Sequence, residues 1–164
     1  MISNNYYIID ASSLIDLSKH NPIDIFPTVW KTLGNLSKQH YIMAPAEVKD
    51  EISKHDDALY SWCKKNENMF KKITVKQTEI VKNILMKYPS FVKDYGNCDA
   101  DPWIVALDIE QSDFSMTING RKNIVVITEE KLDGNKIKIP YICNEYNIGY
   151  IKNVEFFRKE KMQF

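Results

Sequence analysis

Residues 6–17 read Tyr-Tyr-Ile-Ile-Asp-Ala-Ser-Ser-Leu-Ile-Asp-Leu, and this stretch predicts the fold. Its first four residues are large and lack polar alternation, a pattern that indicates a strand covered on both faces, as in a parallel sheet. Asp10 comes where that strand ends, and Ser12 or Ser13 can cap the helix that follows. Ligands bind beyond the carboxyl ends of the strands in open α/β sheets, so Asp10 is a candidate site residue. A turn or capping role explains Asp10 equally well.

The composition predicts one domain spanning residues 1–164, because domains commonly hold roughly 100–200 residues. Hydrophobic residues make up 44% of the chain and aromatic residues 12%, which is enough for a sizeable core. Lys and Arg together number 22, as do Asp and Glu, so the formal net charge is zero. This balance excludes a protein that is strongly basic overall, as many nucleic-acid-binding proteins are, but it does not exclude local basic patches.

We expect a cytoplasmic protein without a membrane segment. The N-terminus lacks a basic region followed by a long apolar run, and no stretch approaches the roughly 18 apolar residues of a membrane span. The odd number of widely spaced cysteines indicates reduced, buried thiols rather than a disulfide framework. These cysteines are Cys63, Cys98 and Cys143.

The rest of the chain alternates expected strands with expected helices. Short apolar or β-branched runs predict strands at 41–44, 124–127 and 148–151. Apolar spacing and capping residues predict helices at 24–40 (with breaks at Pro27 and Gly34), 45–52, 58–65, 77–88, 103–110 and 153–164, and a short one that opens at Ile139-Pro140. Residues 95–98 form an expected loop. Such an alternation predicts an α/β fold, an α/β/α sandwich around a central parallel sheet.

Acidic residues recur where these expected strands end or the following helices begin. Because parallel strands place their carboxyl ends on one edge of a sheet, such acids can converge there. Crowded carboxylates repel one another unless they bind cations, and hard cations such as Mg²⁺ and Mn²⁺ prefer oxygen ligands. Two such ions about 3.5–4 Å apart stabilise the attacking and leaving oxygens of phosphodiester hydrolysis. The acids at these junctions are Asp10, Glu47, Asp99, Asp101, Glu129 and Glu130.

Each acid also has a structural explanation. Asp101 stands before Pro102, where it can cap a helix, and Glu47 can complement a helix dipole. Glu129 and Glu130 can form a solvated loop pair. A capping carboxylate keeps lone pairs for a metal ion, so the structural and metal-binding roles can coexist. The recurrence of acids in this order favours the metal site.

In these motifs the chain resembles the PIN-domain nucleases, including the VapC-type ribonuclease toxins of bacterial toxin–antitoxin pairs. The resemblance covers residues 6 to about 157. In the Asp-x-Asp-Pro-Trp segment at 99–103 and the Ile-Pro…Cys segment at 139–143, the chain is similar to a less characterised bacterial branch of the family. The matching motifs are Asp10-Ala11-Ser12-Ser13, Pro45-Ala46-Glu47-Val48, Asp101 with residues 103–107, and Val126-Ile127-Thr128-Glu129-Glu130.

The resemblance implies an endoribonuclease that requires Mg²⁺ or Mn²⁺, is usually dimeric and is held inactive by a cognate antitoxin. It assigns metal-ligand roles to Asp10, Glu47 and Asp101, with Glu130 as the fourth catalytic acid. The family more often carries Asp or Asn in place of Glu130. Among the remaining residues, Ser12 and Thr128 support the site, and Asp99 and Glu129 are extra acids that can share the metal.

Lysines outnumber acids between residues 64 and 88, and they form either a solvated face or a contact to the RNA backbone. The candidates for RNA contact are Lys64, Lys65, Lys71 and Lys72. Two other functions stay open. A catalytically degenerate PIN-fold module would bind RNA or a protein partner without cleaving. A phosphoryl-transfer protein would use Asp10 as a nucleophile. Such a protein would need a second Asp at position 12, where this chain has Ser12, which disfavours this function.

Overall fold

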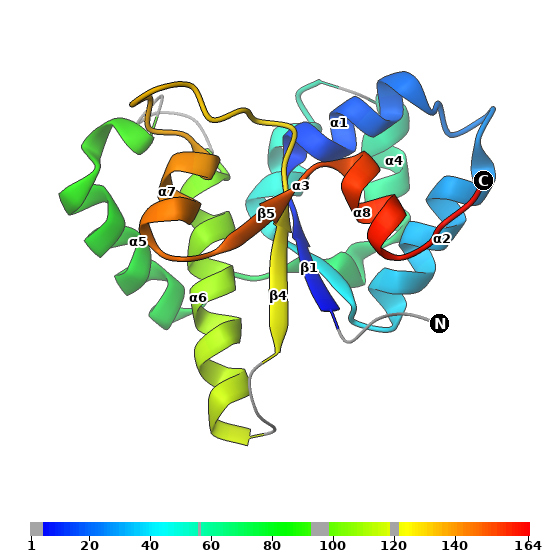
Figure 1. Ribbon diagram of the computed structural model, residues 1–164. Helices are drawn as coiled ribbons and strands as arrows, with labels where there is room; N and C mark the ends of the chain where they lie inside the picture. The colour runs from blue at the N-terminus through cyan, green and yellow to red at the C-terminus, as the bar shows by residue number, and fades with distance from the viewer. Residues whose placement is uncertain (1–4, 56, 93–98, 119–121) are drawn as a thin grey trace.

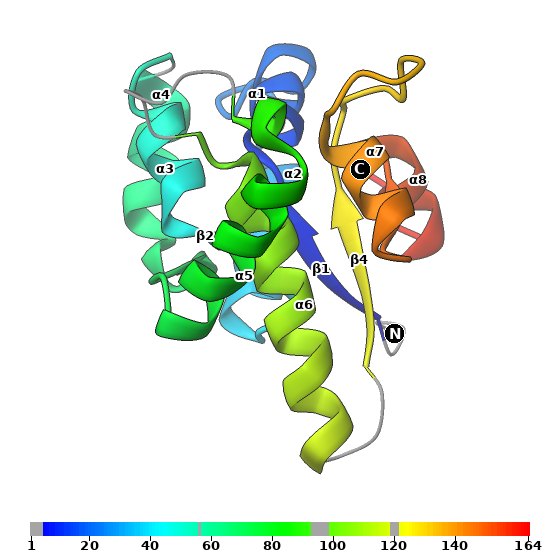
Figure 2. The ribbon, with the colours of Figure 1, turned by 90° about the vertical axis from the view of Figure 1, so that its left-hand side faces the viewer.

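The computed structural model describes residues 5–55, 57–92, 99–118 and 122–164. At its centre lies a five-stranded sheet in the order β3-β2-β1-β4-β5, in which every pairing is parallel (Figures 1 and 2). This arrangement confirms the expected α/β/α sandwich and is consistent with a PIN-like architecture. The strands are β1 (Asn5–Ile9), β2 (Ile42–Pro45), β3 (Phe70–Lys71), β4 (Asn123–Ile127) and β5 (Gly149–Ile151).

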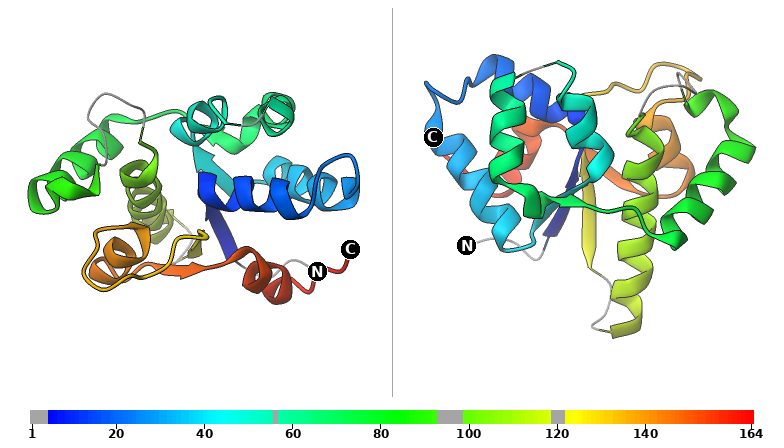
Figure 3. Two further views of the ribbon diagram at one scale, coloured as in Figure 1. Left: turned by 90° about the horizontal axis from the view of Figure 1, so that it is seen from above. Right: turned by 180° about the vertical axis from the view of Figure 1, so that it is seen from behind.

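Helices cover both faces of the sheet. Figures 1 and 3 show α5, α6 and α7 on one face and α1, α2, α4 and α8 on the other. The helix α6 packs across β1, β2 and β4. The α-helices are α1 (Ala11–His20), α2 (Pro27–Lys38), α3 (Ala46–Ile52), α4 (Asp57–Lys65), α5 (Val75–Lys87), α6 (Asp101–Ile118), α7 (Ile139–Glu145) and α8 (Asn153–Lys159), and short 3₁₀ turns occupy Glu67–Met69 and Pro89–Phe91.

The central strand β1 brings Asp10 to the carboxyl edge of the sheet. Ile8 and Ile9 in β1 are each about 1% exposed, as expected for a strand covered on both faces. The register between β1 and β4 runs from Asn5↔Asn123 to Ile9↔Ile127. Asp10 and Thr128 are the next residues after these two strands, so they lie side by side at the carboxyl edge.

Helix α2 differs from the prediction, which placed a helix at 24–40 with breaks at Pro27 and Gly34. One continuous helix begins at Pro27. In the first turn of a helix the backbone N–H has no intrahelical partner, so the missing N–H of proline costs no hydrogen bond there. Gly34 does not interrupt it. A Cβ added to Gly34 would lie 2.7 Å from the side-chain Oδ1 of Asn66, so this glycine allows a close approach between two segments.

Helix α6 is longer than predicted, because it continues past residue 110 to Ile118. The segment around residue 110 contacts α5 through polar side chains. The amide of Gln77 donates to Oε2 of Glu110 at 2.5 Å, and Lys76 forms an ion pair with Asp113 at 2.9 Å. The terminal helix α8, in contrast, ends at Lys159 rather than at residue 164.

The edge strand β3 was not predicted, because two residues carry no periodicity. Its pairing with β2 places Ala44 opposite Phe70 and Pro45 opposite Lys71. The lysine-rich region between residues 64 and 88 is therefore helical only in part.

Two of the cysteines, Cys63 and Cys143, are buried, as predicted. Cys98 and the predicted loop at 95–98 lie outside the described residues. Among the residues that the structure does describe, no helix combines the length and hydropathy that crossing a bilayer demands.

Candidate functional site

Asp10 is the buried centre of the candidate site. It is 2% exposed and occupies the N-cap position of α1, although its side chain makes no capping hydrogen bond there. Its backbone N–H donates to the carbonyl oxygen of Ile127 at 2.9 Å. This bond extends the β1–β4 pairing by one step and fixes the Asp10 backbone against the end of β4.

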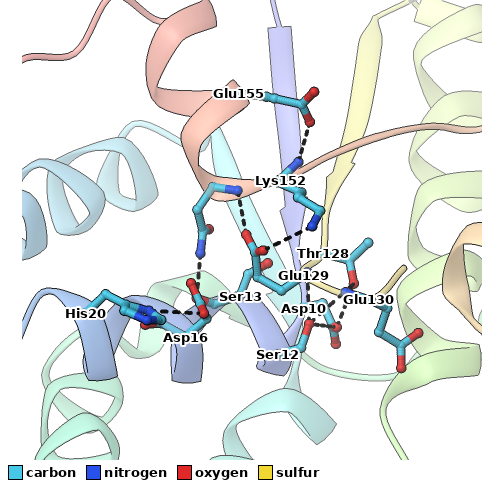
Figure 4. Close-up of polar contacts among 11 residues, drawn as sticks. Asp10, Ser12, Ser13, Asp16, His20, Thr128, Glu129, Glu130, Lys152 and Glu155 are labelled. Carbon is cyan, nitrogen blue, oxygen red and sulfur yellow. Dashed lines mark hydrogen bonds and ion pairs between the residues drawn. The ribbon is translucent and has the colours of Figure 1, made fainter. Parts of the chain in front are cut away.

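Two hydroxyl groups converge on one oxygen of the Asp10 carboxylate (Figure 4). Ser12 Oγ donates to Oδ2 at 2.6 Å, and Thr128 Oγ1 donates to the same oxygen at 3.1 Å. Each hydroxyl also accepts a backbone N–H from the segment after β4: Ser12 from Glu129 and Thr128 from Glu130, both at 3.1 Å. The hydroxyls therefore tie Asp10 to the backbone of the two glutamates.

The pKa of the Asp10 carboxyl lies above its ordinary value. Burial is the main cause, since it disfavours the charged form, and the negative charge of Glu130 acts in the same direction. The hydrogen bonds from Ser12 and Thr128 oppose this shift because they stabilise the carboxylate. A cation at this edge would relieve both the burial penalty and the repulsion from Glu130.

The two glutamates after β4 each accept a hydrogen bond from the first residue of a helix. Oε1 of Glu129 accepts the N–H of Asn153 in α8 at 2.9 Å, and its Oε2 lies 3.9 Å from Nζ of Lys152. Oε2 of Glu130 accepts the N–H of Ile139 in α7 at 3.0 Å. Both acids thus satisfy helix N-termini, which carry partial positive charge. Of the two, only Glu130 acts on the pKa of Asp10.

Glu47 and Asp101 begin helices that start at the same edge. Glu47 is in the first turn of α3, directly after β2, and burial raises its pKa. Its Oε2 is buried and accepts no hydrogen bond from any described residue. Asp101 opens α6 and is 6% exposed, and its N–H donates to Oδ1 of Asp99 at 3.2 Å. Asp99 therefore has a turn-like contact with Asp101.

The predicted acids share an edge without forming a preassembled metal cage. Within the described parts of the chain, no group of three or more His, Cys, Asp or Glu side chains is spaced to hold a metal ion. Among the predicted acids, the negative charge of Glu130 raises the pKa of Asp10. The donor chemistry is uniform, because every candidate ligand is a carboxylate oxygen.

The predicted RNA-contacting lysines fall into two groups. Lys64 and Lys65 are exposed at the end of α4, where Nζ of Lys64 lies 4.9 Å from the centre of the Tyr60 ring. Lys71 is half-buried at the end of β3, and Lys72 follows it exposed. The pairing of Lys71 with Pro45 puts this second group near Glu47 at the carboxyl edge.

Asn153 is a site residue that the sequence did not reveal. It is 4% exposed, and its side-chain amide donates to the backbone oxygen of Ser13 at 2.9 Å while its N–H binds Glu129. It thereby connects α8, α1 and the segment after β4. An asparagine preceding an apolar run signals a helix start, but nothing local signals partners so distant in sequence.

The fold and the site together define a parallel α/β protein with a buried acidic centre at the carboxyl edge of its sheet. The chain belongs to the family described as a domain of unknown function, DUF4411, whose profile matches residues 7–164. Neither the curated proteins nor the solved structures contain a match.

Proposed function

We propose that this protein is a metal-dependent endoribonuclease that hydrolyses RNA phosphodiester bonds, and that it is the toxin of a bacterial toxin–antitoxin pair. The observation that carries the proposal is the state of Asp10. A buried carboxylate is held by two hydroxyls beside a second acid, at the edge where parallel α/β sheets bind ligands. The resemblance to PIN-domain nucleases supplies the reaction class.

The residues present fit a hard divalent cation in their chemistry. The buried Oε2 of Glu47 accepts no hydrogen bond from a described residue, and Asp10 has a raised pKa that a cation would lower. Mg²⁺ commonly binds through one or two carboxylates and keeps several waters, so three preassembled ligands are not required. Asp10, Glu47 and Asp101 would hold the ion, with Glu130 as a further acid. When bound, Mg²⁺ or Mn²⁺ would neutralise charge and polarise the scissile phosphodiester.

The chain's own residues orient and shield this centre. The Ser12 and Thr128 hydroxyls fix the direction of the Asp10 carboxylate, because both donate to Oδ2. Burial of Asp10 keeps bulk water away from it, which strengthens electrostatic interactions there. Glu130 is held by the N–H of Ile139, which limits how far its carboxylate can turn.

One observation favours a second candidate, a catalytically degenerate PIN-fold module that binds RNA or a protein partner. The described acids do not form a group of three spaced for an ion. Such a module would retain affinity for RNA without cleaving it and without a requirement for divalent ions. Measurements of binding and cleavage on the same RNA separate the two functions.

The toxin assignment carries further proposals about partners. A cognate antitoxin would restrain the protein in the cytoplasm, where its RNA substrate is found, and a homodimer would be the active form. A small gene encoded beside this one, whose product co-purifies with the protein and blocks RNA cleavage, would support the toxin assignment.

The direct test incubates purified protein with mixed RNAs in Mn²⁺, in Mg²⁺ and with a chelator. The proposal expects cleavage that requires the ion and disappears in Asp10→Asn. The matched control is Asp16→Asn, which removes a half-exposed acid from the same helix, where it pairs with His20. RNA binding without ion-dependent cleavage by the wild type would favour the degenerate module instead.

A further inference from the structure

Two adjoining cavities are lined by residues of α6 and of the segment between α7 and β5, together with residues of α5 in one cavity and of β4 in the other. Helices α5, α6 and α7 cover the same face of the sheet (Figure 1). The first has a volume of about 360 Å³ and reaches Lys122 and Gly149, at the amino ends of β4 and β5. The second, of about 400 Å³, lies between α5 and α6. The residues that line both cavities are Asp108, Ser112, Asn147 and Ile148.

These cavities are separate from the site around Asp10. Because the strands are parallel, the amino ends of β4 and β5 are at the edge of the sheet opposite to Asp10 and Thr128. Asp108 comes seven residues after Asp101 in α6, which corresponds to about 10 Å along a helix. The proposed nuclease chemistry makes no use of this region.

Asp108 is a buried acid with an unused hydrogen-bonding atom. It is 4% exposed, and its Oδ1 accepts a bond from Ser112 Oγ at 3.3 Å. Its Oδ2 is buried without a hydrogen-bond partner among the described residues. Burial raises the pKa of Asp108 to about 7. A buried carboxyl oxygen without a donor is unfavourable, so such a group calls for an explanation.

The nearby cations are engaged with other groups. Nζ of Lys122, which lines the first cavity together with Asp108, lies 4.2 Å from the centre of the Tyr6 ring in a cation–π contact. Lys76 forms its ion pair with Asp113, at the rim of the second cavity. Neither lysine donates a hydrogen bond to Oδ2 of Asp108.

The remaining wall of the second cavity is largely apolar. Ile80 and Ile84 of α5 face Ile109 and Met116 of α6 across it. A ligand that satisfies both features has an apolar body, which contacts these side chains, and a cationic head with N–H donors, which reaches Asp108. An anionic ligand would be repelled by Asp108 and Asp113.

We propose that the Asp108 cavities form a second ligand site, which binds a small organic cation with an apolar body and an amidinium, guanidinium or ammonium head. The head pairs with the carboxyl group of Asp108, which lines both cavities, and the body lies between α5 and α6. This assignment is independent of the proposed nuclease activity, because none of its residues belongs to the carboxyl edge.

Binding depends on pH through Asp108, because the cationic head pairs with the ionised carboxylate. The titratable groups around Asp108 are Asp113 on α6, Lys122 before β4, Cys143 on α7 and Tyr146 at the end of α7. Burial raises the pKa of Cys143, and the charge of Asp108 adds to that effect, so this thiol stays neutral. Affinity for a cation should therefore rise with pH as Asp108 ionises around pH 7.

The test compares three probes of one shape on the whole protein: benzamidine, which is cationic, benzamide, which is neutral, and benzoate, which is anionic. Binding at millimolar concentration is followed by NMR shifts of the backbone amides of Asn147 and Ile148. We expect benzamidine to bind at least about tenfold more tightly than benzamide at pH 8, and this preference to shrink at pH 6. Equal affinities for the two, or no binding of benzamidine, would overturn the proposal.

Two variants then assign the preference to its residue. Asp108→Asn keeps the shape of the side chain and should abolish the preference for benzamidine. Asp113→Asn removes an acid at the rim of the same cavity and should leave most of that preference intact. If Asp108→Asn kept the preference, Asp108 would not be the group that recognises the cation. The wild-type comparison stands even if a variant folds poorly.

Discussion

The Thr128 hydroxyl donates to Oδ2 of Asp10 at 3.1 Å, across 118 residues of sequence, and it is joined on that oxygen by the Ser12 hydroxyl. Each hydroxyl also accepts a backbone N–H, from Glu129 at Ser12 and from Glu130 at Thr128. This arrangement stabilises the ionised carboxylate against its burial.

Loss of the Ser12 hydroxyl should therefore raise the pKa of Asp10 further. In Ser12→Ala we expect the pH at which RNA cleavage becomes half-maximal to move upward and the rate at pH 7 to fall by roughly 10-fold. Carboxyl NMR titration of Asp10 checks the pKa without relying on activity. Ser53→Ala is the control, because that hydroxyl donates to the backbone oxygen of Asp50 in an exposed turn. An unchanged Asp10 titration in Ser12→Ala would contradict the assigned role.

Removing the charge of Asp10 should separate folding from activity. Asp10→Asn eliminates a buried carboxylate with a raised pKa, so the free energy of unfolding near pH 7 should stay the same or increase. RNA cleavage should fall by more than about 100-fold because a central ion ligand is lost. Denaturant unfolding and cleavage assays on one preparation measure both. Wild-type cleavage rates in Asp10→Asn would remove Asp10 from the mechanism.

Divalent ions should stabilise the folded state if the carboxyl edge binds them. An ion at one hundred times its dissociation constant contributes about 2.7 kcal/mol by mass action, which raises the Tm of a protein of this size by roughly 5–10 °C. We expect Mn²⁺ and Mg²⁺ to raise the Tm of the wild type, and to raise it much less in Asp10→Asn. If millimolar Mn²⁺ left the wild-type Tm unchanged and no RNA were cut, the degenerate module would be favoured.

Much of this fold could be predicted from the sequence because its strands are unbroken apolar runs. The run before Asp10 and the β-branched run at 124–127 identify the two central strands, and parallel pairing then puts Asp10 and Thr128 at one edge. The edge strand β3 could not be predicted, since its two residues become a strand only by pairing with β2. The length of α6 depends likewise on contacts with α5.

The position of the candidate acids at one edge of the sheet could be predicted, whereas their hydrogen bonds could not. The acidic residues at strand ends were visible as a pattern. The bonds from Glu129 to Asn153 and from Glu130 to Ile139 depend on where α8 and α7 begin in space, which no local pattern specifies. Asp108 did carry a local signal, because it is an acid within the apolar run of α6. Its significance depends on the cavities, which only the tertiary structure forms.

The raised pKa of Asp108 gives a prediction about stability and pH. The folded state holds the proton to about pH 7, whereas the ordinary pKa of an Asp is 3.8. Between these values the folded state binds more protons than the unfolded state, so Asp108 makes stability fall as pH rises, by at most about 4 kcal/mol. Asp108→Asn should raise the Tm at pH 8 and change it little at pH 5. Equal effects at both pH values would show that burial does not shift this carboxyl.

The last prediction concerns how a chain of zero net charge with an acidic edge holds RNA, a polyanion. The edge repels phosphate until a cation neutralises it, so affinity must come partly from lysines placed elsewhere. Lys71 pairs across β3 and β2 with Pro45, two residues before Glu47, and Lys72 follows it, whereas Lys64 and Lys65 lie in the last turn of α4. The two lysine groups can therefore be tested against each other.

The comparison uses Lys71→Glu with Lys72→Glu, against Lys64→Glu with Lys65→Glu, both in an Asp10→Asn background with one RNA. Each lost phosphate contact lowers the slope of log affinity against log salt by roughly 0.7 for single strands. We expect the first pair to flatten this slope and weaken binding to unrelated RNA sequences alike, because phosphate contacts carry no base information. The second pair should change the slope less. Unchanged slopes in both would make these lysines a solvated face, and the tail residues Arg158, Lys159 and Lys161 would be tested next.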